Sequence, residues 1–265
     1  MMSQNPEPVR VTVEARDGGH VATVAIDNAG RANSLGSPTM RAFIAAIEAL
    51  GRDPELRVVI VTGVGDRAFM GGADIFELGG LDPHSARDFI LLVHGMSRAL
   101  RDLPVPVIAR VNGVCLGAGL EVMAACDMRV AADTAVFGMP EVRIGLPSVV
   151  EAALLPQLIG WGRTRVLLYT GANIGAREAA EWGLVERIVP HETLDAAVAE
   201  WVDAIVGAGP RAIRLQKALM REWEAMPVND AIQAGVRSIA LAYETDEPRR
   251  LIAGTIAHLK ARRKR

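Results

Sequence analysis

The stretch GVCLGAGLEVMAACD, residues 113–127, places a single acid, Glu121, among small and apolar residues in the middle of the chain. Gly117 and Gly119 open a predicted helix, so the backbone N–H near Ala118 has no helical acceptor and no bulky side chain over it. Glu121 lies three residues beyond Ala118, and a helix turns its side chain to the side of that amide. One interpretation is that the Ala118 amide and the Glu121 carboxylate face the same spot. A first-turn acid that stabilises the helix dipole fits this stretch equally well.

Strand-like and helix-like patterns alternate on both sides of this stretch. They predict a hairpin over Val9–Ala15 and His20–Asp27, helices over 41–50, 86–101 and the opening stretch itself, and strands over 57–63, 105–111 and 128–133. This alternation predicts an α/β fold with largely parallel strands. After about Pro190 only helical patterns remain, broken at 207–210 and around Pro227, and they predict a helical C-terminal subdomain.

Composition and charge narrow the classes of protein that the chain could belong to. The net charge is -2, with 29 basic and 31 acidic residues, so no general field attracts nucleic acid or an anionic membrane. The most apolar window, Leu103–Cys126, contains Arg110, Asn112 and Glu121, which argues against a membrane helix. Two cysteines without a pairing pattern, and an N-terminus without an apolar stretch, lead us to expect a cytoplasmic protein. The basic end, 260–265, is interpreted as a solvated helix end, with anion binding as the alternative.

Two further segments carry candidate functional groups. In RAFMGGADIFEL, residues 67–78, two glycines expose the amides of Gly72 and Ala73, although Asp74 as the cap of an ordinary turn is the simpler interpretation. In AVFGMPEVRIGLP, residues 135–147, a proline precedes Glu141 and favours a loop that carries one acid into a cleft. By itself Glu141 fits a surface acid better.

Together these segments resemble the crotonase superfamily of enoyl-CoA hydratases and isomerases. AFMGGADI (68–75) is similar to its F-x-x-G-A-D-[IL] stretch, residues 112–127 to N-G-x-x-x-G-x-G-x-E-x-x-x-x-C-D, and VFGMPEVRIGL (136–146) to F-x-x-P-E-x-x-x-G. The order and spacing match, and the resemblance covers about residues 9–186. It implies a spiral of repeated β-β-α units, with residues 1–195 as the catalytic core. Residues 196–265 would then be a helical oligomerisation subdomain, which implies a homotrimer or a dimer of trimers.

The resemblance also implies roles for individual residues. The N–H groups of Ala73 and Ala118 would bind the thioester oxygen of an acyl-CoA, and such preorganised donors are often the largest catalytic contribution. Glu121 would activate water and Glu141 would protonate Cα, so the implied reaction is syn hydration of a trans-2-enoyl-CoA. The implied substrate-binding residues are Asn33, Ser34, Leu35, Gly72, Asp74, Ile75 and Gly117. Coenzyme A enters as part of the substrate, and no other cofactor is implied.

One segment departs from the family pattern and keeps alternatives open. GLPSVVEAALLP, residues 145–156, has bulkier side chains than the glycine-rich stretch of many hydratases, and Glu151 could bring a third carboxylate near the chemistry. We favour the interpretation that Glu151 lies in the first turn of the next helix, and that His94 lies on a helix surface. An isomerase, or a non-catalytic CoA- or RNA-binding protein, remains the alternative. The five histidines lack metal-ligand spacing, so no metal site is predicted, and no G-x-S-x-G elbow is present.

Overall fold

The structure is a computed structural model that describes residues 8–262, and it confirms the predicted α/β class. The chain divides into two compact units between Val202 and Asp203, later than the predicted boundary at residue 195. The division lies within α7, on which Leu194, Val198 and Val202 are buried.

The strands are β1 (Val9–Arg16), β2 (Gly19–Ile26), β3 (Leu56–Gly63), β4 (Ala68–Met70), β5 (Val107–Val111), β6 (Val114–Leu116), β7 (Met128–Ala132), β8 (Val136–Gly138), β9 (Asn173–Gly175) and β10 (Arg187–Val189). The helices are α1 (Ser37–Leu50), α2 (Ile75–Leu78), α3 (Pro83–Asp102), α4 (Ala118–Ala124), α5 (Leu155–Thr170), α6 (Ala176–Trp182), α7 (Leu194–Gly207), α8 (Pro210–Trp223), α9 (Val228–Ala242) and α10 (Glu247–Arg262), with 3-10 turns η1 (Ala29–Arg31), η2 (Glu141–Ile144), η3 (Val150–Leu154) and η4 (His191–Thr193).

The first unit is built from two sheets that the chain visits in turn. The larger sheet has the order β1-β2-β3-β5-β7-β10, and all its pairs are parallel except the β1–β2 hairpin. The smaller sheet has the order β4-β6-β8-β9, and its first three strands are parallel. Each of β3, β5 and β7 is followed by a strand of the smaller sheet and then by a helical segment. This is the repeated β-β-α unit that the family resemblance implied.

The stretch at 113–127 differs from its predicted single helix. It begins with the strand β6, and α4 covers only Ala118–Ala124. A strand of three residues is too short to show the alternation by which strands are detected in a sequence. The strand before it begins at Val107 and not at Val105. As a result, α4 starts directly at the end of a strand.

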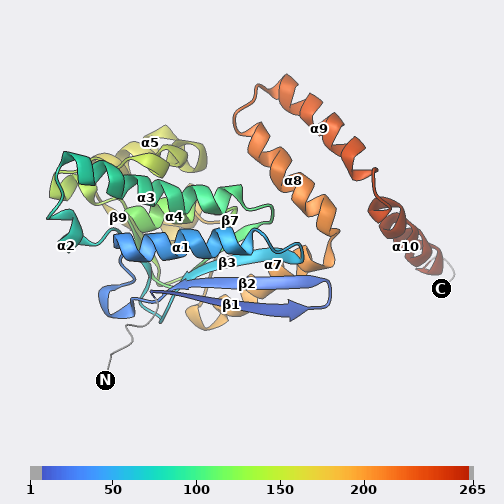
Figure 1. Cartoon of the computed structure of the whole chain (residues 1–265), viewed down its shortest axis with the longest axis horizontal. Coiled ribbons are helices and arrows are strands. Elements are labelled where there is room, and N and C mark those ends of the chain that lie inside the picture. The colour runs from blue at the N-terminus through green and yellow to red at the C-terminus, as the bar shows by residue number, and fades with distance from the viewer. Residues whose placement is uncertain (1–7, 263–265) are drawn as a thin grey trace. The chain divides into compact units, whose positions relative to one another are not determined.

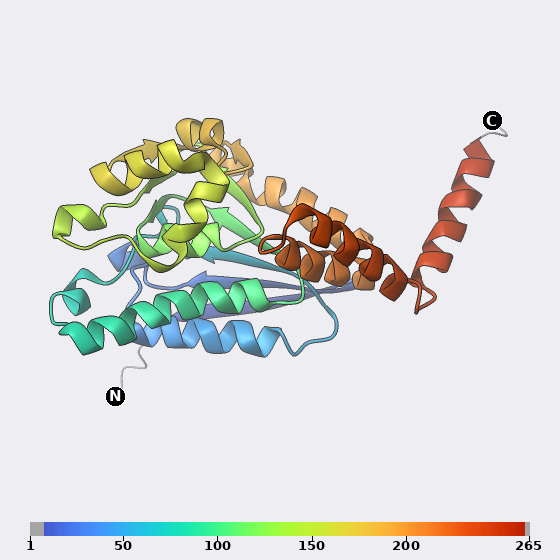
Figure 2. The ribbon, with the colours of Figure 1, turned by 90° about the horizontal axis from the view of Figure 1, so that it is seen from above.

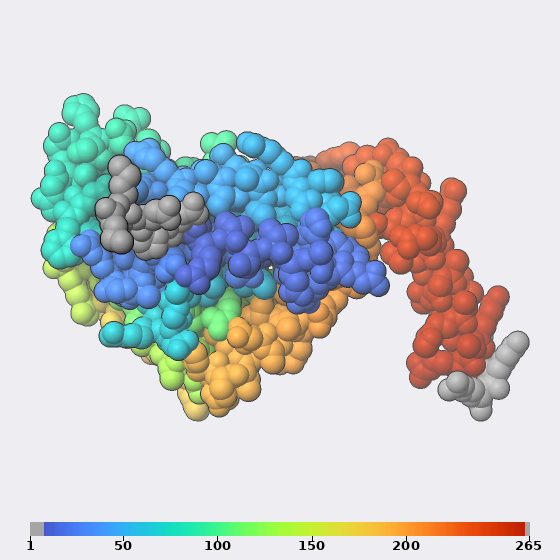
Figure 3. Space-filling model, turned by 60° about the horizontal axis from the view of Figure 1, so that its bottom comes forward, coloured from blue at the N-terminus to red at the C-terminus, as the bar shows by residue number. Residues whose placement is uncertain are grey.

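The core of the first unit lies between the larger sheet and the helices α1 and α3. Figures 1 and 2 show these two helices side by side on one face of the strands. Phe43 and Ile47 of α1, with Met96 and Leu100 of α3, are completely buried at helical spacing. The β1–β2 hairpin reaches the molecular surface (Figure 3, dark blue), where most of β1 is exposed. This packing holds the ends of the parallel strands in fixed positions.

The second unit contains α8, α9 and α10, in agreement with the predicted helical C-terminal region. Glu247, at the start of α10, accepts hydrogen bonds from the backbone N–H groups of Arg211 and Ala212 and so caps α8. The basic residues at 263–265 lie outside the described residues. No helix within residues 8–262 has both the length and the apolar character needed to cross a membrane.

Candidate active site

The N-terminus of α4 is pressed against the smaller sheet by two glycines. Gly117 has φ 51 and ψ -124, a backbone conformation that residues with a Cβ rarely adopt, and it turns the chain from β6 into α4. At Gly119 an added Cβ would lie 2.2 Å from the carbonyl oxygen of Met70 in β4. Any larger residue would push α4 away from β4. The two glycines therefore fix the position of the Ala118 amide.

A second turn with a free amide follows β4. Gly72 has φ 106, and an added Cβ would lie 3.1 Å from the carbonyl oxygen of Leu116, at the end of β6. Because β4 and β6 are parallel neighbours, the turns after them lie next to each other. Neither the N–H of Ala73 nor that of Ala118 donates a hydrogen bond to any residue in the described part of the chain. Two unpaired donors at adjacent strand ends can bind one oxyanion.

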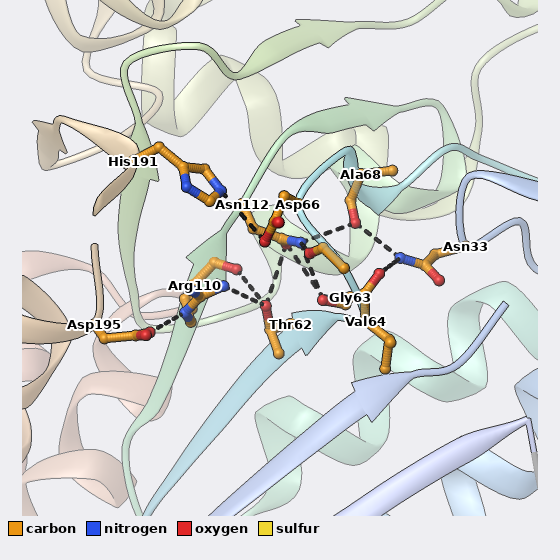
Figure 4. A network of polar contacts seen from close by, with 11 residues as sticks. Asn33, Thr62, Gly63, Val64, Asp66, Ala68, Arg110, Asn112, His191 and Asp195 are labelled. Carbon is orange, nitrogen blue, oxygen red and sulfur yellow. Dashed lines mark hydrogen bonds and ion pairs between the residues drawn. The ribbon is translucent and has the colours of Figure 1, made fainter. Parts of the chain in front are cut away.

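Buried asparagines hold the strand that leads into this turn (Figure 4). The Nδ2 groups of Asn33 and Asn112 donate to the carbonyl oxygen of Ala68, at 2.8 Å and 3.2 Å. Asn33 Nδ2 also donates to the carbonyl oxygen of Val64, and Asn33 Oδ1 accepts the N–H of Asn28. The family resemblance implied that Asn33 binds the substrate. In the structure its side chain, completely buried, positions the backbone around β4.

A cleft of about 480 Å³ opens in front of these turns. Of the predicted site residues, seven line it: Ser34, Gly72, Ala73, Asp74, Ile75, Gly117 and Glu141. Four do not, namely Asn33, Leu35, Ala118 and Glu121, and all four are buried. The carboxylate of Asp74 accepts the N–H groups of Phe76 and Glu77 and caps α2, which was the simpler interpretation of this residue. The structure thus brings the predicted residues into one region, partly as lining and partly as the layer behind it.

The sequence did not identify two basic residues of the cleft. Arg31 and Arg143 both line it, and the guanidinium of Arg31 lies 5.5 Å from the ring centre of Phe76 and 3.3 Å from Asp74. Neither arginine belongs to a sequence motif that marks an anion site. Their placement depends on the turns that carry them, so no sequence signal was available.

Glu121 is buried beneath the cleft, with only 3% of its surface exposed. Its Oε1 accepts the backbone N–H of Ala152 at 3.1 Å. Burial raises the pKa of Glu121 to about 8, because the charged form loses its hydration, and the charges of Glu141 and Glu151 act in the same direction. The Ala152 hydrogen bond lowers the pKa but does not offset the burial. A carboxylate with this pKa is a far stronger base than an exposed glutamate.

Glu141 lies near Glu121 and is carried by a different segment. It opens η2 directly after Pro140, and its Oε2 accepts the hydroxyl of Ser148 at 2.8 Å. An added Cβ at Gly117 would lie 2.3 Å from Oε1 of Glu141, so the missing side chain at 117 makes room for this carboxylate. The sequence indicated no role for Ser148. Its role in holding Glu141 depends on a loop conformation that no motif encodes.

Glu151 lies in the first turn of a helical segment, η3, as expected, but it is also buried close to Glu121. Its Oε1 lies 2.8 Å from Nδ1 of His94 on α3, and its charge raises the pKa of Glu121. His94 is half-exposed, so its interpretation as a surface residue was incomplete. The two residues are far apart in the sequence, and only the packing of η3 on α3 brings them together.

A metal site is not apparent in the part of the chain that the structure covers. Among residues 8–262 no three His, Cys, Asp or Glu side chains are grouped closely enough to hold an ion. Cys115 and Cys126 are both buried and unbridged.

Known proteins resemble this chain in sequence and in fold. The family model described as enoyl-CoA hydratase/isomerase matches residues 16–263. A crotonyl-CoA hydratase of Syntrophomonas wolfei is 34% identical over 244 residues, covering 92% of this chain and 93% of that protein. A short-chain-enoyl-CoA hydratase of Clostridium acetobutylicum is 35% identical, covering 86% and 84%. The crystal structure of an enoyl-CoA hydratase from Bacillus anthracis superposes with a TM-score of 0.87 at 31% identity, covering 95% and 96%. The crotonase-like fold is thereby confirmed, and the chain belongs to the enoyl-CoA hydratase/isomerase family.

Proposed function

We propose that this protein is an enoyl-CoA hydratase that adds water syn across the double bond of a trans-2-enoyl-CoA. The observation that carries the proposal is the meeting of two carboxylates, Glu121 and Glu141, at the N-terminus of α4, where the amide of Ala118 is unpaired. Relatives named crotonyl-CoA hydratase and short-chain-enoyl-CoA hydratase support the same reaction.

The proposed reaction begins at the thioester. The N–H groups of Ala73 and Ala118 hold its carbonyl oxygen and stabilise the negative charge that develops there as the enolate forms. Glu121 takes one proton from water while the water oxygen bonds to Cβ. Glu141 gives one proton to Cα, the carbonyl reforms, and the product is a 3-hydroxyacyl-CoA. Water is thus fully accounted for, with Glu121 left protonated and Glu141 left ionised until solvent exchange restores both.

The cleft supplies the remaining contacts that we propose for the substrate. Ser34, Gly72, Asp74, Ile75 and Gly117 line it and would contact the CoA portion or the thioester. Asn33 and Leu35 are buried behind the cleft lining and would act indirectly, by holding the backbone that contacts the substrate. Coenzyme A is part of the substrate, and the proposal includes no separate cofactor.

The test is turnover of crotonyl-CoA, followed by the loss of enoyl-thioester absorbance and by mass spectrometry of the product in heavy-oxygen water. We expect one labelled oxygen in the 3-hydroxyacyl product. Glu121→Gln keeps the shape and the hydrogen bond from Ala152 but removes the base, and it should abolish most of the activity. A wild-type protein that leaves crotonyl-CoA and longer enoyl-CoAs unchanged would overturn the proposal.

An isomerase is the second candidate, and one observation favours it: Glu141 lines the cleft, whereas Glu121 does not. An isomerase can move a proton between carbon atoms with one acid. Incubation with a 3-enoyl-CoA in heavy-oxygen water separates the two. Formation of the 2-enoyl isomer without incorporated label would favour isomerisation.

We also propose a homotrimer or a dimer of trimers, in the cytoplasm. Four large apolar residues of α9 lie at helical spacing and are more than half exposed: Val228, Ile232, Val236 and Ile239. A stripe of this kind on a helix usually packs against another chain. The two unbridged cysteines are compatible with a reducing compartment. Size-exclusion chromatography with light scattering checks the assembly, and a monomer would contradict it.

A further inference from the structure

The proposed reaction leaves one buried acid without a role. Glu151 is 8% exposed, and its Oε1 is bound to Nδ1 of His94 at 2.8 Å. Its other oxygen, Oε2, is buried and has no hydrogen-bond partner among the described residues. A buried carboxylate with one free oxygen costs free energy, so its retention calls for a physical reason.

The backbone next to Glu151 is strained, and this conformation of the chain fixes where Glu151 lies. Val150, the preceding residue, has φ 36, which is an unusual conformation for a β-branched residue. Such strain costs about 1 to 3 kcal/mol and persists only where the surroundings impose it. The N–H of Ala152, the following residue, donates to Oε1 of Glu121. The same short turn therefore holds Glu151 and contacts the water-activating acid.

The charged groups around the two acids are few. Glu121 on α4 is faced by Glu141 from η2 and by Glu151 from η3, and the only titratable group on the packed strands β4 and β6 is the buried thiol of Cys115. Glu151 is faced by Glu121 and, from α3, by His94. Further along α3, Arg98 pairs with Asp102. The arginines of α5 contact other groups, Arg163 the ring of Trp182 and Arg165 the ring of Trp161.

We propose that His94 and Glu151 form a positioning pair that keeps a negative charge behind Glu121 and thereby sets how strong a base Glu121 is. This inference deepens the proposed hydratase function and rests on it for the role of Glu121. Neither residue of the pair lines the cleft, so they act through Glu121 and not on the substrate. His94 contributes the hydrogen bond that holds Oε1 of Glu151 in place.

The pair makes a specific prediction about three variants. Glu151→Gln removes the negative charge, so the ionised form of Glu121 becomes easier to reach. His94→Ala removes the hydrogen bond that holds the Glu151 carboxylate in place, so the charge of Glu151 acts less strongly on Glu121 and the consequence for Glu121 has the same direction. His94→Asn restores an N–H donor close to the position of Nδ1 and should behave as the wild type. His84→Ala, an exposed histidine of the same helix, is the matched control.

Two measurements test the pair. The first is the pH profile of kcat/KM with crotonyl-CoA, whose rising limb reports the loss of the Glu121 proton. We expect this limb to move to lower pH by about one unit in Glu151→Gln and His94→Ala. In His94→Asn and His84→Ala it should not move. The second measurement titrates the Glu121 carboxyl carbon by NMR in protein labelled with ¹³C-glutamate, with Glu121→Gln identifying the signal. The same shifts are expected without any substrate present.

The two measurements separate a failure of this inference from a failure of the proposed function. If the wild type does not turn over enoyl-CoA, the NMR titration still decides whether the pair acts on Glu121. An unchanged titration of Glu121 in Glu151→Gln would overturn the inference, even in an active hydratase. A lowered stability of His94→Ala with no movement of either curve would assign the pair a purely structural role and would also overturn it.

Discussion

The two proposed catalytic acids, Glu121 and Glu141, lie in segments that differ strongly in burial. Every residue of α4 is buried, and Glu121 is fixed there by tight contacts of α4 with β4. The segment 142–147, which follows Glu141, is exposed throughout and carries apolar side chains such as Ile144 into solvent. Glu121 obtains its base strength from burial, whereas Glu141 obtains its place from a loop and from the hydroxyl of Ser148. In the proposed reaction, proton removal would therefore take place at a buried, tightly packed position and proton delivery at an accessible one.

The largest expected effects come from removing each acid in turn. Glu121→Gln and Glu141→Gln should each lower kcat for hydration by about 10² to 10⁴, the usual contribution of a general acid or base. Steady-state kinetics with crotonyl-CoA measures this, with Glu48→Gln on the exposed side of α1 as the control. The assignment fails if Glu121→Gln retains wild-type kcat. If Glu121→Gln loses activity and Glu141→Gln keeps it, Glu141 is dispensable for hydration.

The tight packing of α4, the helix that carries Glu121, can be disrupted at Gly119. In Gly119→Ala the new methyl group meets the Met70 carbonyl, so α4 must move, and the free energy of unfolding should fall by about 3 kcal/mol. Activity should fall with it, because the Ala118 amide moves too. The matched control is Gly162→Ala on α5, where nothing lies within 4 Å and a gain of about 0.5 to 1 kcal/mol is expected. Urea unfolding of both variants compares them, and equal stabilities would disprove the close packing.

The burial of Glu121 should also appear in the pH dependence of stability. Its pKa, about 8 in the folded chain, lies above the usual 4.5, so the folded state holds a proton that the unfolded state has lost between these values. The unfolding free energy therefore falls as pH rises from about 4.5 to 8. Glu121→Gln lacks this loss and should gain on the order of 5 kcal/mol relative to wild type between pH 4.5 and pH 9. Thermal or urea unfolding at both pH values measures it, and parallel pH dependence of the two proteins would contradict the raised pKa.

The smallest effect is expected from Val150, where the loop that follows Glu141 is strained. Val150→Gly relieves the unfavourable φ of 36 and should increase the free energy of unfolding by about 0.5 to 1 kcal/mol, after the entropy cost of glycine. Val166→Gly, on a regular turn of α5, should instead destabilise by about 1 kcal/mol. Differential scanning calorimetry compares the two. A destabilised Val150→Gly would show that the valine's packing outweighs its strain.

Much of the fold was predictable from local patterns. The hairpin, the helix containing Phe43 and Ile47, and the helical C-terminal region follow from alternation and from helical spacing over eight or more residues. The short strand β6 was missed because three residues carry no period. The glycine turns at 72 and 117 were correctly expected, since few other residues allow their backbone angles.

The candidate site was likewise predictable from the sequence in one part and not in another. The sequence by itself determined which groups are available: two glutamates at family-like positions, two glycine turns with unpaired amides, and one unexplained acid at 151. Only the tertiary structure decided what these groups become. Desolvation and neighbouring charge make Glu121 a strong base, and the packing of η3 against α3 unites Glu151 with His94. Base strength and pairing depend on distances between segments that are remote in the chain, and such distances exist only after the core has formed.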